Sequence, residues 1–480
     1  MNRPNVIFIM ADQMKAKASQ MYWDRACPTP SLSRLASEGV LFRNAFTPHP
    51  LCVPARTAVM ASKFPHTLGT SLNNTLMPAG ANHIFRIWNQ AGYRGGIIGK
   101  NNCFDQKDDL DLLDVYCEIG SRGFPADSST KGMQWVRPME CVEAAHAVRR
   151  NMPWQTPRIS YAVTDYPLED YGTGLVAAQT VRFLEQHGNE PFALSVSFPD
   201  PHEPYEAPRH YAEMFPPEHI ELPPWRANEF DDRAPERNRV LHQMLGMETD
   251  PENEVRKMVG IYYAMVRFLD DGIGQILDAL ERLRLRDNTI VVFTADHGDF
   301  MGEHGMAVKG GVFYDCLVNV PLILSWPGHV TSGAVDESMV NTIDIVPTLL
   351  ALQGLDVPRD MQGEGLPVVT STAPRDTAFS EYGAGGPPFR ASDLEKLPEP
   401  YGYQTVIQSL LWREAEGHRK MVRTQDFKYV HDPNGDSDEL YDLVNDPWEL
   451  TNVVGNPKYG RVIGDMKQRL ANWSIATMGD

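Results

Sequence analysis

Two pairs of polar residues could bind a metal ion, because each pair closely follows an apolar run that is typical of a buried strand. The first pair is Asp12-Gln13 and the second is Asp296-His297. Two carboxylates, an amide oxygen and an imidazole form a mostly hard ligand set, which suits Ca²⁺, Mg²⁺ or Mn²⁺. A single polar residue at a strand end is usually only hydrogen-bonded, but two such pairs together favour a metal site.

A cysteine and an arginine lie at a spacing that could serve nucleophilic chemistry. The segment CVPAR runs from Cys52 to Arg56 and precedes a helix-favouring run. Because proline suits the first turn of a helix, we expect a helix that begins near Pro54 and directs its N-terminal amides at an anion. Arg56 would balance the charge there. The alternative interpretation is a buried structural cysteine beside a surface arginine.

Three further side chains could bind an anion or move a proton. Lys100 closes the segment GGIIGK, His202 lies in the segment PHEP, and Lys309 follows the Asp296-His297 pair. Taken singly, each has an ordinary explanation, since a lysine is usually solvated and a histidine in a proline-rich loop is often only packed. Apart from a family pattern, the ordinary explanation is favoured for each of the three.

The motifs ADQ, CVPAR, GK, PHEP, ADHG and a following lysine, in this order, resemble those of the formylglycine-dependent sulfatases. The chain is similar to this family of the alkaline phosphatase superfamily over nearly its whole length, and in particular to the branch that contains choline-sulfatase and phosphonate monoester hydrolase. The resemblance implies a sulfuric ester hydrolase, which cleaves a sulfate monoester to an alcohol and inorganic sulfate.

The resemblance also implies how residue 52 acts. A formylglycine-generating maturation enzyme would oxidise Cys52 to an aldehyde, and the metal would acidify a hydroxyl of the hydrated aldehyde. That hydroxyl would attack sulfur and expel the alcohol, and the sulfated hemiacetal would then collapse to release sulfate. Arg56 would hold residue 52 in this scheme.

The remaining roles are implied in the same way. Lys100 and Lys309 would bind the sulfate oxygens, and Lys309 with His202 would protonate the leaving oxygen. The family implies Ca²⁺, but many relatives have aspartate where this chain has Gln13 and asparagine where it has His297, so Mn²⁺ and Mg²⁺ stay open as alternatives. The predicted metal ligands are Asp12, Gln13, Cys52 as formylglycine, Asp296 and His297.

One position departs from the family pattern. Sulfatases commonly have a histidine two residues after the lysine of the GK motif, and this chain has Asn102 there. An asparagine can form hydrogen bonds but cannot shuttle a proton. The base that assists the collapse of the hemiacetal is therefore unassigned, with His304 as one candidate, although a supporting role near His297 suits that histidine better.

Three other functions compete with sulfate hydrolysis. A phosphonate monoester or phosphodiester hydrolase of the same superfamily would look alike at most motifs, and Lys100 is the residue that favours sulfate over it. A thiol-based phosphatase requires a longer spacing between cysteine and arginine than Cys52 to Arg56. A catalytically inactive binding protein on the same scaffold is the third alternative, and Asn102 is the residue that favours it.

The strand-like and helix-like segments that would position these residues predict an α/β fold. The large domain would hold a mostly parallel mixed sheet sandwiched by helices, with ligands at the carboxyl ends of its strands. We expect a helix from Ser31, as N-cap, to Gly39, and another from about Lys257 to Leu285. Residues 1–374 would form this catalytic domain, and residues 375–480 a smaller α+β domain with a short antiparallel sheet. The predicted strands are Asn5 to Met10, Gly95 to Gly99, Phe192 to Phe198, Thr289 to Thr294 and Pro321 to Trp326.

Composition limits the partners of the chain. The 480 residues carry a formal net charge of −19, which disfavours nucleic acid and anionic membranes as partners. The N-terminal residues lack the features of a secretory signal, and six scattered cysteines fit reduced thiols, so a cytoplasmic location is expected. A small anionic sulfate ester is the expected substrate, and a homo-oligomer is compatible with a chain of this size.

The alcohol part of the substrate is not evident from the sequence. Two stretches, 104–157 and 383–402, read as irregular loops that could shape the substrate pocket. Four side chains of the C-terminal third are candidate lining residues, although a surface position is the ordinary explanation for each. They are Tyr382, Trp412, His418 and Arg419.

Overall fold

The computed structural model describes residues 3–120, 123, 125–226, 228–231, 234–433 and 437–478, without the side chains of 125–129 and 148. Within these ranges, nine strands form one mixed sheet in the order β11-β2-β10-β9-β1-β7-β3-β4-β5. The pairing is parallel except where β10 meets β2 and β9 and where β4 meets β5. The predicted α/β class is therefore confirmed.

The five apolar runs that were predicted as buried strands are β1, β3, β7, β9 and β10. A separate parallel pair is formed by β6 (Tyr161–Thr164) and β8 (Tyr205–Pro208). The strands of the large sheet are β1 Asn5–Ala11, β2 Gly39–Phe46, β3 Arg94–Gly99, β4 Val115–Ile119, β5 Pro125–Lys131, β7 Phe192–Phe198, β9 Thr289–Ala295, β10 Leu322–Ser325 and β11 Ala334–Asn341.

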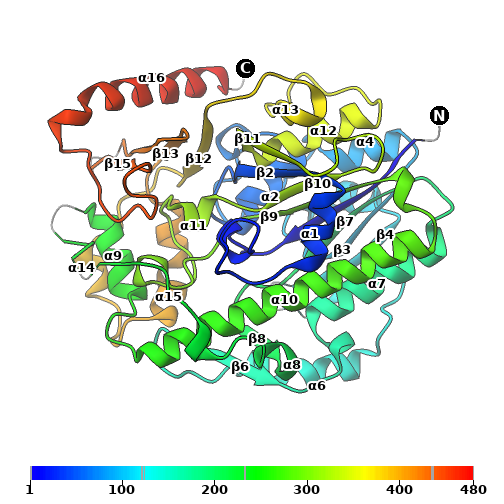
Figure 1. The fold of residues 1–480 in the computed structure, drawn as a ribbon, viewed down its shortest axis with the longest axis horizontal. Coiled ribbons are helices and arrows are strands. Elements are labelled where there is room, and N and C mark those ends of the chain that lie inside the picture. The colour runs from blue at the N-terminus through cyan, green and yellow to red at the C-terminus, as the bar shows by residue number, and fades with distance from the viewer. Residues whose placement is uncertain are drawn as a thin grey trace.

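Helices cover both faces of the large sheet, with α7 and α10 below it and α4 and α12 above it in Figure 1. The lower helices are α1 Pro30–Ser37, α6 Met139–Arg150, α7 Gly172–His187 and α10 Glu252–Arg282. The upper helices are α2 Cys52–Ala61, α4 Ile84–Gln90 and α12 Ile345–Leu352. Shorter helices are α3 Pro65–Leu68, α5 Lys107–Asp111, α8 Arg209–Ala212, α11 Asp315–Val318 and α13 Pro367–Thr370.

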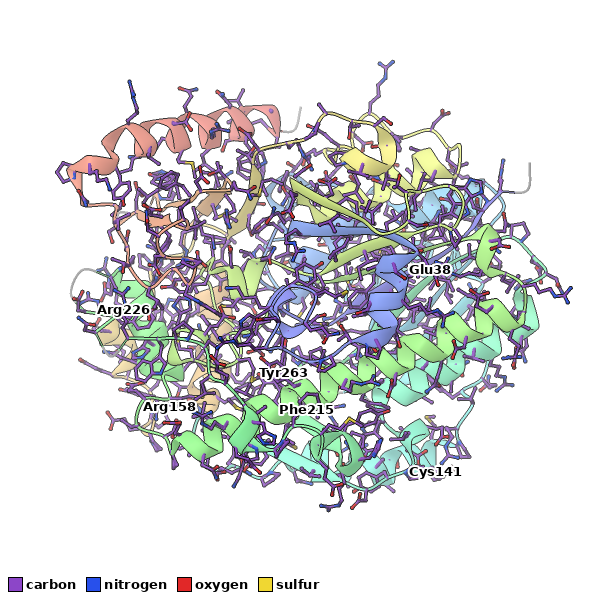
Figure 2. All side chains as sticks on the ribbon, viewed as in Figure 1. Glu38, Cys141, Arg158, Phe215, Arg226 and Tyr263 are labelled. Carbon is purple, nitrogen blue, oxygen red and sulfur yellow. The ribbon has the colours of Figure 1, made fainter. Side chains whose placement is uncertain are left out.

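The core has two halves because side chains alternate along the central strand β1. Ile7 and Ile9 enter the cluster below the sheet, whereas Val6 and Phe8 enter the cluster above it. Both faces are covered, so all seven residues of β1 are buried and its sequence is apolar from Val6 to Ala11. Side chains also fill the space around α10, where the rings of Tyr263 and Phe215 lie 6.0 Å apart (Figure 2).

A second sheet near the C-terminus is antiparallel and, over the residues described, has the order β12-β13-β14-β15. Helix α16 packs on it through Met466, Leu470 and Trp473, as seen at the upper left of Figure 1. This agrees with the predicted small sheet, while the domain boundary at 374/375 stays a prediction. The elements of this part are β12 Ala378–Tyr382, α14 Ala391–Leu394, α15 Tyr403–Ala415, β13 Arg419–Arg423, β14 Phe427–His431, β15 Glu439–Asp442 and α16 Gly460–Ala476; α9 Glu236–Leu245 contacts α15.

The prediction that 104–157 is an irregular loop is wrong. The stretch contains α5, β4, β5 and α6. Strand β4 alternates between buried and half-buried residues, which is the period of a strand, but its five residues are too few to stand out in the sequence.

Among the helices of the described ranges, none combines the length and apolar character that a bilayer span requires. All six cysteines are free thiols.

Helix α1 receives its N-terminal cap from a distant residue. The helix begins at Pro30, so the predicted cap, Ser31, lies inside it, and Gly39 already belongs to β2. The carboxylate of Asp270 in α10 accepts hydrogen bonds from the backbone nitrogens of Ser31 and Leu32 at 2.9 and 2.8 Å. A carboxylate at this end also interacts favourably with the helix dipole.

Replacing Asp270 with alanine is expected to lower the free energy of unfolding by about 1–3 kcal/mol, since two amides of α1 lose a buried acceptor. The control is Asp278→Ala, because Asp278 contacts Arg34 of α1 at 2.6 Å but its side chain is 73% exposed. That variant should cost less than about 1 kcal/mol. Urea titration of both variants tests the cap, and equal losses would contradict it.

Candidate active site

The strand ends bring the two predicted acidic pairs together. Strand β1 lies between β7 and β9, and Ala11, its last residue, is in register with Ala295, the last residue of β9. Asp12 and Asp296 therefore leave the sheet side by side. One oxygen of Asp296 accepts the backbone N–H of Gln13 at 3.0 Å and that of His297 at 2.9 Å, which fixes the turn after each strand.

Residue 52 lies at this edge of the sheet, at the N-terminus of α2. The sulfur of Cys52 is 3.1 Å from Nε2 of His297 and 3.7 Å from Oδ1 of Asp12. One ligand atom each from Asp12, Cys52, Asp296 and His297 lies within 4.8 Å of all the others. All four side chains are buried, so the arrangement is a closed group of potential metal ligands.

The donor set of this group fits a divalent cation. Nδ1 of His297 is 2.9 Å from the carbonyl of Gly298 and donates to it, so Nε2 faces Cys52 and Asp12 and could bind a metal ion when it carries no proton. Two carboxylates and this nitrogen are suitable ligands for Ca²⁺, Mn²⁺ or Mg²⁺. Asp12, Asp296 and His297 would hold the ion together with residue 52.

Two cations offset the paired carboxylates. Lys100 donates to Asp12, and Nε of Arg56 is 2.7 Å from Oδ2 of Asp296. Burial acts to raise the pKa of the Asp12 carboxyl, and a negative charge on Cys52 adds to this, but Lys100 and Arg56 help to hold that pKa below its usual value. Arg56 also donates to the hydroxyl of Ser197 at 2.6 Å, which fixes the guanidinium.

The site stabilises a negative charge at position 52. Burial alone would raise the pKa of the Cys52 thiol, yet Lys100, Lys309 and His297 bring it well below its usual value. The ammonium of Lys309 is 3.3 Å from the sulfur. The positive potential is local, since the whole chain carries a net charge of −19.

Lys309 connects residue 52 to His202. Its ammonium is 2.9 Å from Nε2 of His202 and 2.6 Å from Oε1 of Gln13. Nδ1 of His202 is 2.6 Å from the carbonyl of Glu203 and donates to it, which directs Nε2 toward Lys309. A proton could therefore pass between Lys309 and His202 beside the reacting position.

The side chain of Gln13 is already engaged in hydrogen bonds. Its oxygen accepts from Lys309, and its nitrogen donates to Glu203 at 2.8 Å and to Asp299 at 2.5 Å. Burial raises the pKa of Asp299, whereas His202 and Lys309 outweigh burial and lower the pKa of Glu203. In this arrangement Gln13 orients Lys309, and its role as a metal ligand stays a prediction.

Helix α2 differs in one respect from the expectation. It begins at Cys52 rather than near Pro54, and its Val53 N–H donates to Oδ1 of Asn73 at 3.1 Å. The amide of Val53 is thus occupied by a protein group and is not directed at an anion. Asn73 in turn contacts Glu414 of α15.

Several site residues were not found from the sequence. Glu203 and Asp299 lie inside the PHEP and ADHGD segments and could have been found by their position next to assigned residues. Ser197, Asn73 and Glu414 belong to no motif, and only the fold brings them to residue 52 or its partners.

Asn102 and His304 were the two residues that the sequence analysis discussed for the collapse of the hemiacetal. Asn102 follows β3 and has a φ of 48°. His304 contacts the carboxylate of Glu229 and stacks on Tyr314, with ring centroids 3.7 Å apart. Its observed partners therefore suit a structural role, and the base for hemiacetal collapse stays unassigned.

The four candidate lining residues of the C-terminal third divide into two groups. Tyr382, His418 and Arg419 line one cavity of about 290 Å³, which also borders the loop that carries Asn73. Trp412 packs on Phe389 and is 42% exposed, away from that cavity.

Comparisons with known proteins agree with this geometry. A sulfatase family model matches residues 4–355. The ulvan-active sulfatase of Formosa agariphila is 26% identical over 100% of this chain and 82% of its own length, and the choline-sulfatase of Rhizobium meliloti is 27% identical over 95% and 83%. The solved structure of the phosphonate monoester hydrolase of Agrobacterium radiobacter has a TM-score of 0.79 and 25% identity over 99% of this chain and 96% of that one.

The matched range contains Asp12, Cys52, Asp296, His297 and Lys309, which the structure brings to one buried site. It also contains every strand of the large sheet. A match of this extent is not a local motif similarity. The chain therefore belongs to the sulfatase family and is a sulfuric ester hydrolase.

Proposed function

We propose that the protein hydrolyses a sulfate monoester to an alcohol and inorganic sulfate, with a formylglycine derived from Cys52 as the nucleophile. The observation that carries the proposal is the position of the Cys52 sulfur. It lies 3.1 Å from Nε2 of His297 and 3.3 Å from the ammonium of Lys309. Residue 52 thus contacts both the potential metal ligands and the cation that would bind the sulfate.

One divalent ion would be held by Asp12, residue 52, Asp296 and His297, with Ca²⁺ expected and Mn²⁺ or Mg²⁺ as alternatives. When bound, it would act as a Lewis acid toward oxygen at the reacting position. Arg56 supports this arrangement because it pairs with Oδ2 of Asp296 and is itself fixed by Ser197.

Lys100 and Lys309 would bind the sulfate oxygens, and Lys309 with His202 would protonate the leaving alcohol. The 2.9 Å contact between Lys309 and Nε2 of His202 supports the proton transfer. Gln13 keeps the ammonium in place through its side-chain oxygen. Each of these side chains is held by a hydrogen-bonded partner, so little reorganisation is needed when the substrate binds.

Maturation of Cys52 would require a formylglycine-generating enzyme as a partner. All residues from Cys52 to Arg56 are buried in α2, and Cys52 itself is 5% exposed. We infer that such an enzyme acts on this segment before the chain folds, because the folded helix does not present it.

The alternative function is hydrolysis of a phosphonate monoester or phosphodiester. The TM-score of 0.79 to a phosphonate monoester hydrolase supports it. Sulfate is favoured by Lys100, a buried ammonium that contacts Asp12 and adds positive charge to the site.

The two functions are distinguished by kcat/KM on an aryl sulfate and on a matched aryl phosphonate monoester. We expect the sulfate to be preferred by protein that is co-produced with a formylglycine-generating enzyme, and we expect Cys52→Ala to abolish turnover because it removes the nucleophile. A phosphonate preference would favour the alternative. Equal activity in the Cys52→Ala control would rule out the mechanism, and metal binding without turnover of any ester would indicate an inactive scaffold.

Removal of the metal by a chelator is expected to abolish turnover, and adding back Ca²⁺, Mn²⁺ or Mg²⁺ singly should show which ion restores it.

Asp296→Asn should lose bound metal, as measured by elemental analysis of the purified protein, because it weakens an anionic ligand. The matched control is Asp200→Asn, since Asp200 is also buried after a strand of the same sheet but pairs with Arg149. Equal metal content in both variants would contradict the ligand assignment.

Lys309→Ala is expected to lower kcat/KM by about 10²–10⁴-fold for an alkyl sulfate and by less for a nitrophenyl sulfate. The reason is that a good leaving group needs no proton. Lys100→Ala is the comparison, because Lys100 binds sulfate in this mechanism and should affect both substrates equally. A loss in Lys309→Ala that does not depend on the leaving group would argue against its role as a proton donor.

A further inference from the structure

Helix α2 presents residue 52 at its N-terminus but has no capping side chain of its own. Leu51 occupies the N-cap position, and its side chain cannot accept a hydrogen bond. The N–H of Val53 is one of the amides that every α-helix leaves without a partner inside the helix. Asn73, from the loop after α3, supplies the acceptor at 3.1 Å. The segment next to the nucleophile is thus held from outside the helix.

Asn73 is held in turn by Glu414, which lies in α15 near the C-terminal sheet. Nδ2 of Asn73 donates to Oε1 of Glu414 at 2.6 Å, and the backbone nitrogen of Asn73 donates to Oε2 at 3.2 Å. Because an ionised carboxylate only accepts hydrogen bonds, Glu414 directs the NH₂ group toward itself and the oxygen of Asn73 toward Val53. Glu414 is 1% exposed, so water competes little for these bonds.

We propose that Glu414 is a positioning residue for the nucleophile at position 52, acting through Asn73 and Val53. The inference rests on the proposed function. The side chain of residue 52 must stay close to both His297 and Lys309, and a misplacement of about 1 Å in a catalytic site can cost about 10²-fold in rate. Through Glu414, a helix from the last quarter of the chain takes part in the alignment of a group near its beginning.

The same carboxylate carries a charge that opposes the binding of an anionic ester. Burial raises the pKa of Glu414, hydrogen bonds from Asn73 act to lower it, and a negative charge on Cys52 raises it further. The carboxylate contacts Asn73, which contacts the residue after position 52, so it is close enough to interact with charge there. Its hydrogen bonds should support kcat, whereas its charge should raise KM, and two variants separate these effects.

Glu414→Gln removes the charge and replaces one acceptor by a donor, whereas Glu414→Asp keeps the charge but is too short to reach Asn73. We expect kcat to fall about ten-fold or more in both, and KM to fall only in Glu414→Gln. The matched control is Glu416→Gln, since Glu416 is also buried in this segment but lies 3.4 Å from Arg419. Its kcat and KM should match the wild type. Glu414 variants with the kcat and KM of this control would overturn the proposal.

The relay is tested by combining two substitutions. Asn73→Ala should lower kcat as much as Glu414→Gln does, and the double variant should show no further loss, because the connection to Val53 is already broken. Fully additive losses would overturn the proposal, since Glu414 would then act on residue 52 by another route.

Cobalt binding to protein with unconverted Cys52 gives a readout without turnover. The absorption band of a thiolate–cobalt contact reports whether residue 52 reaches the metal. We expect Glu414→Asp to weaken this binding about ten-fold and Glu416→Asp to leave it unchanged. If the wild type shows the band but hydrolyses no ester, only the proposed function fails. If the Glu414 variant shows the wild-type cobalt affinity, the positioning role is overturned.

Discussion

The closeness of two buried carboxylates is the constraint on which the rest of the site depends. Asp12 and Asp296 leave adjacent parallel strands in register, and neither can stay ionised in a dry site without compensation. Lys100 and Arg56 supply part of it, each on one carboxylate. A divalent ion would supply the remainder. The same positive charges that allow the two carboxylates to stay ionised also create the positive potential that an anionic ester needs.

The electrostatic potential at the site and the net charge of the whole chain therefore have opposite signs in this protein. The net charge of −19 is distributed over the whole chain, whereas the cations nearest residue 52, buried Lys100 and half-buried Lys309, are held by hydrogen bonds. Burial strengthens their effect, because charges interact more strongly where water is excluded. The site selects an anion at short range in spite of the average field.

The hydrogen bonds around residue 52 come from segments that are far apart in the chain. The contact between Asn73 and Glu414 joins residues 341 positions apart, and Arg56 reaches Asp296 over 240 positions. Segments near the N-terminus supply Asp12 and Cys52, while Glu414 from the last quarter of the chain contacts Asn73 behind α2. The site can therefore form only when most of the chain is folded.

Residue type and order were enough to predict the α/β fold, the five central strands and the members of the main cluster, because buried strands are apolar and ligands follow their ends. Asp12, Asp296 and His297 were found in this way, whereas Cys52 and Lys309 were found from the motifs that resemble those of the sulfatase family. The tertiary structure decided which polar groups pair: Asp270 as the cap of α1, the hydrogen bonds of Gln13, and Asn73 with Glu414 behind α2. Such pairs depend on packing between distant segments, and no local pattern encodes them.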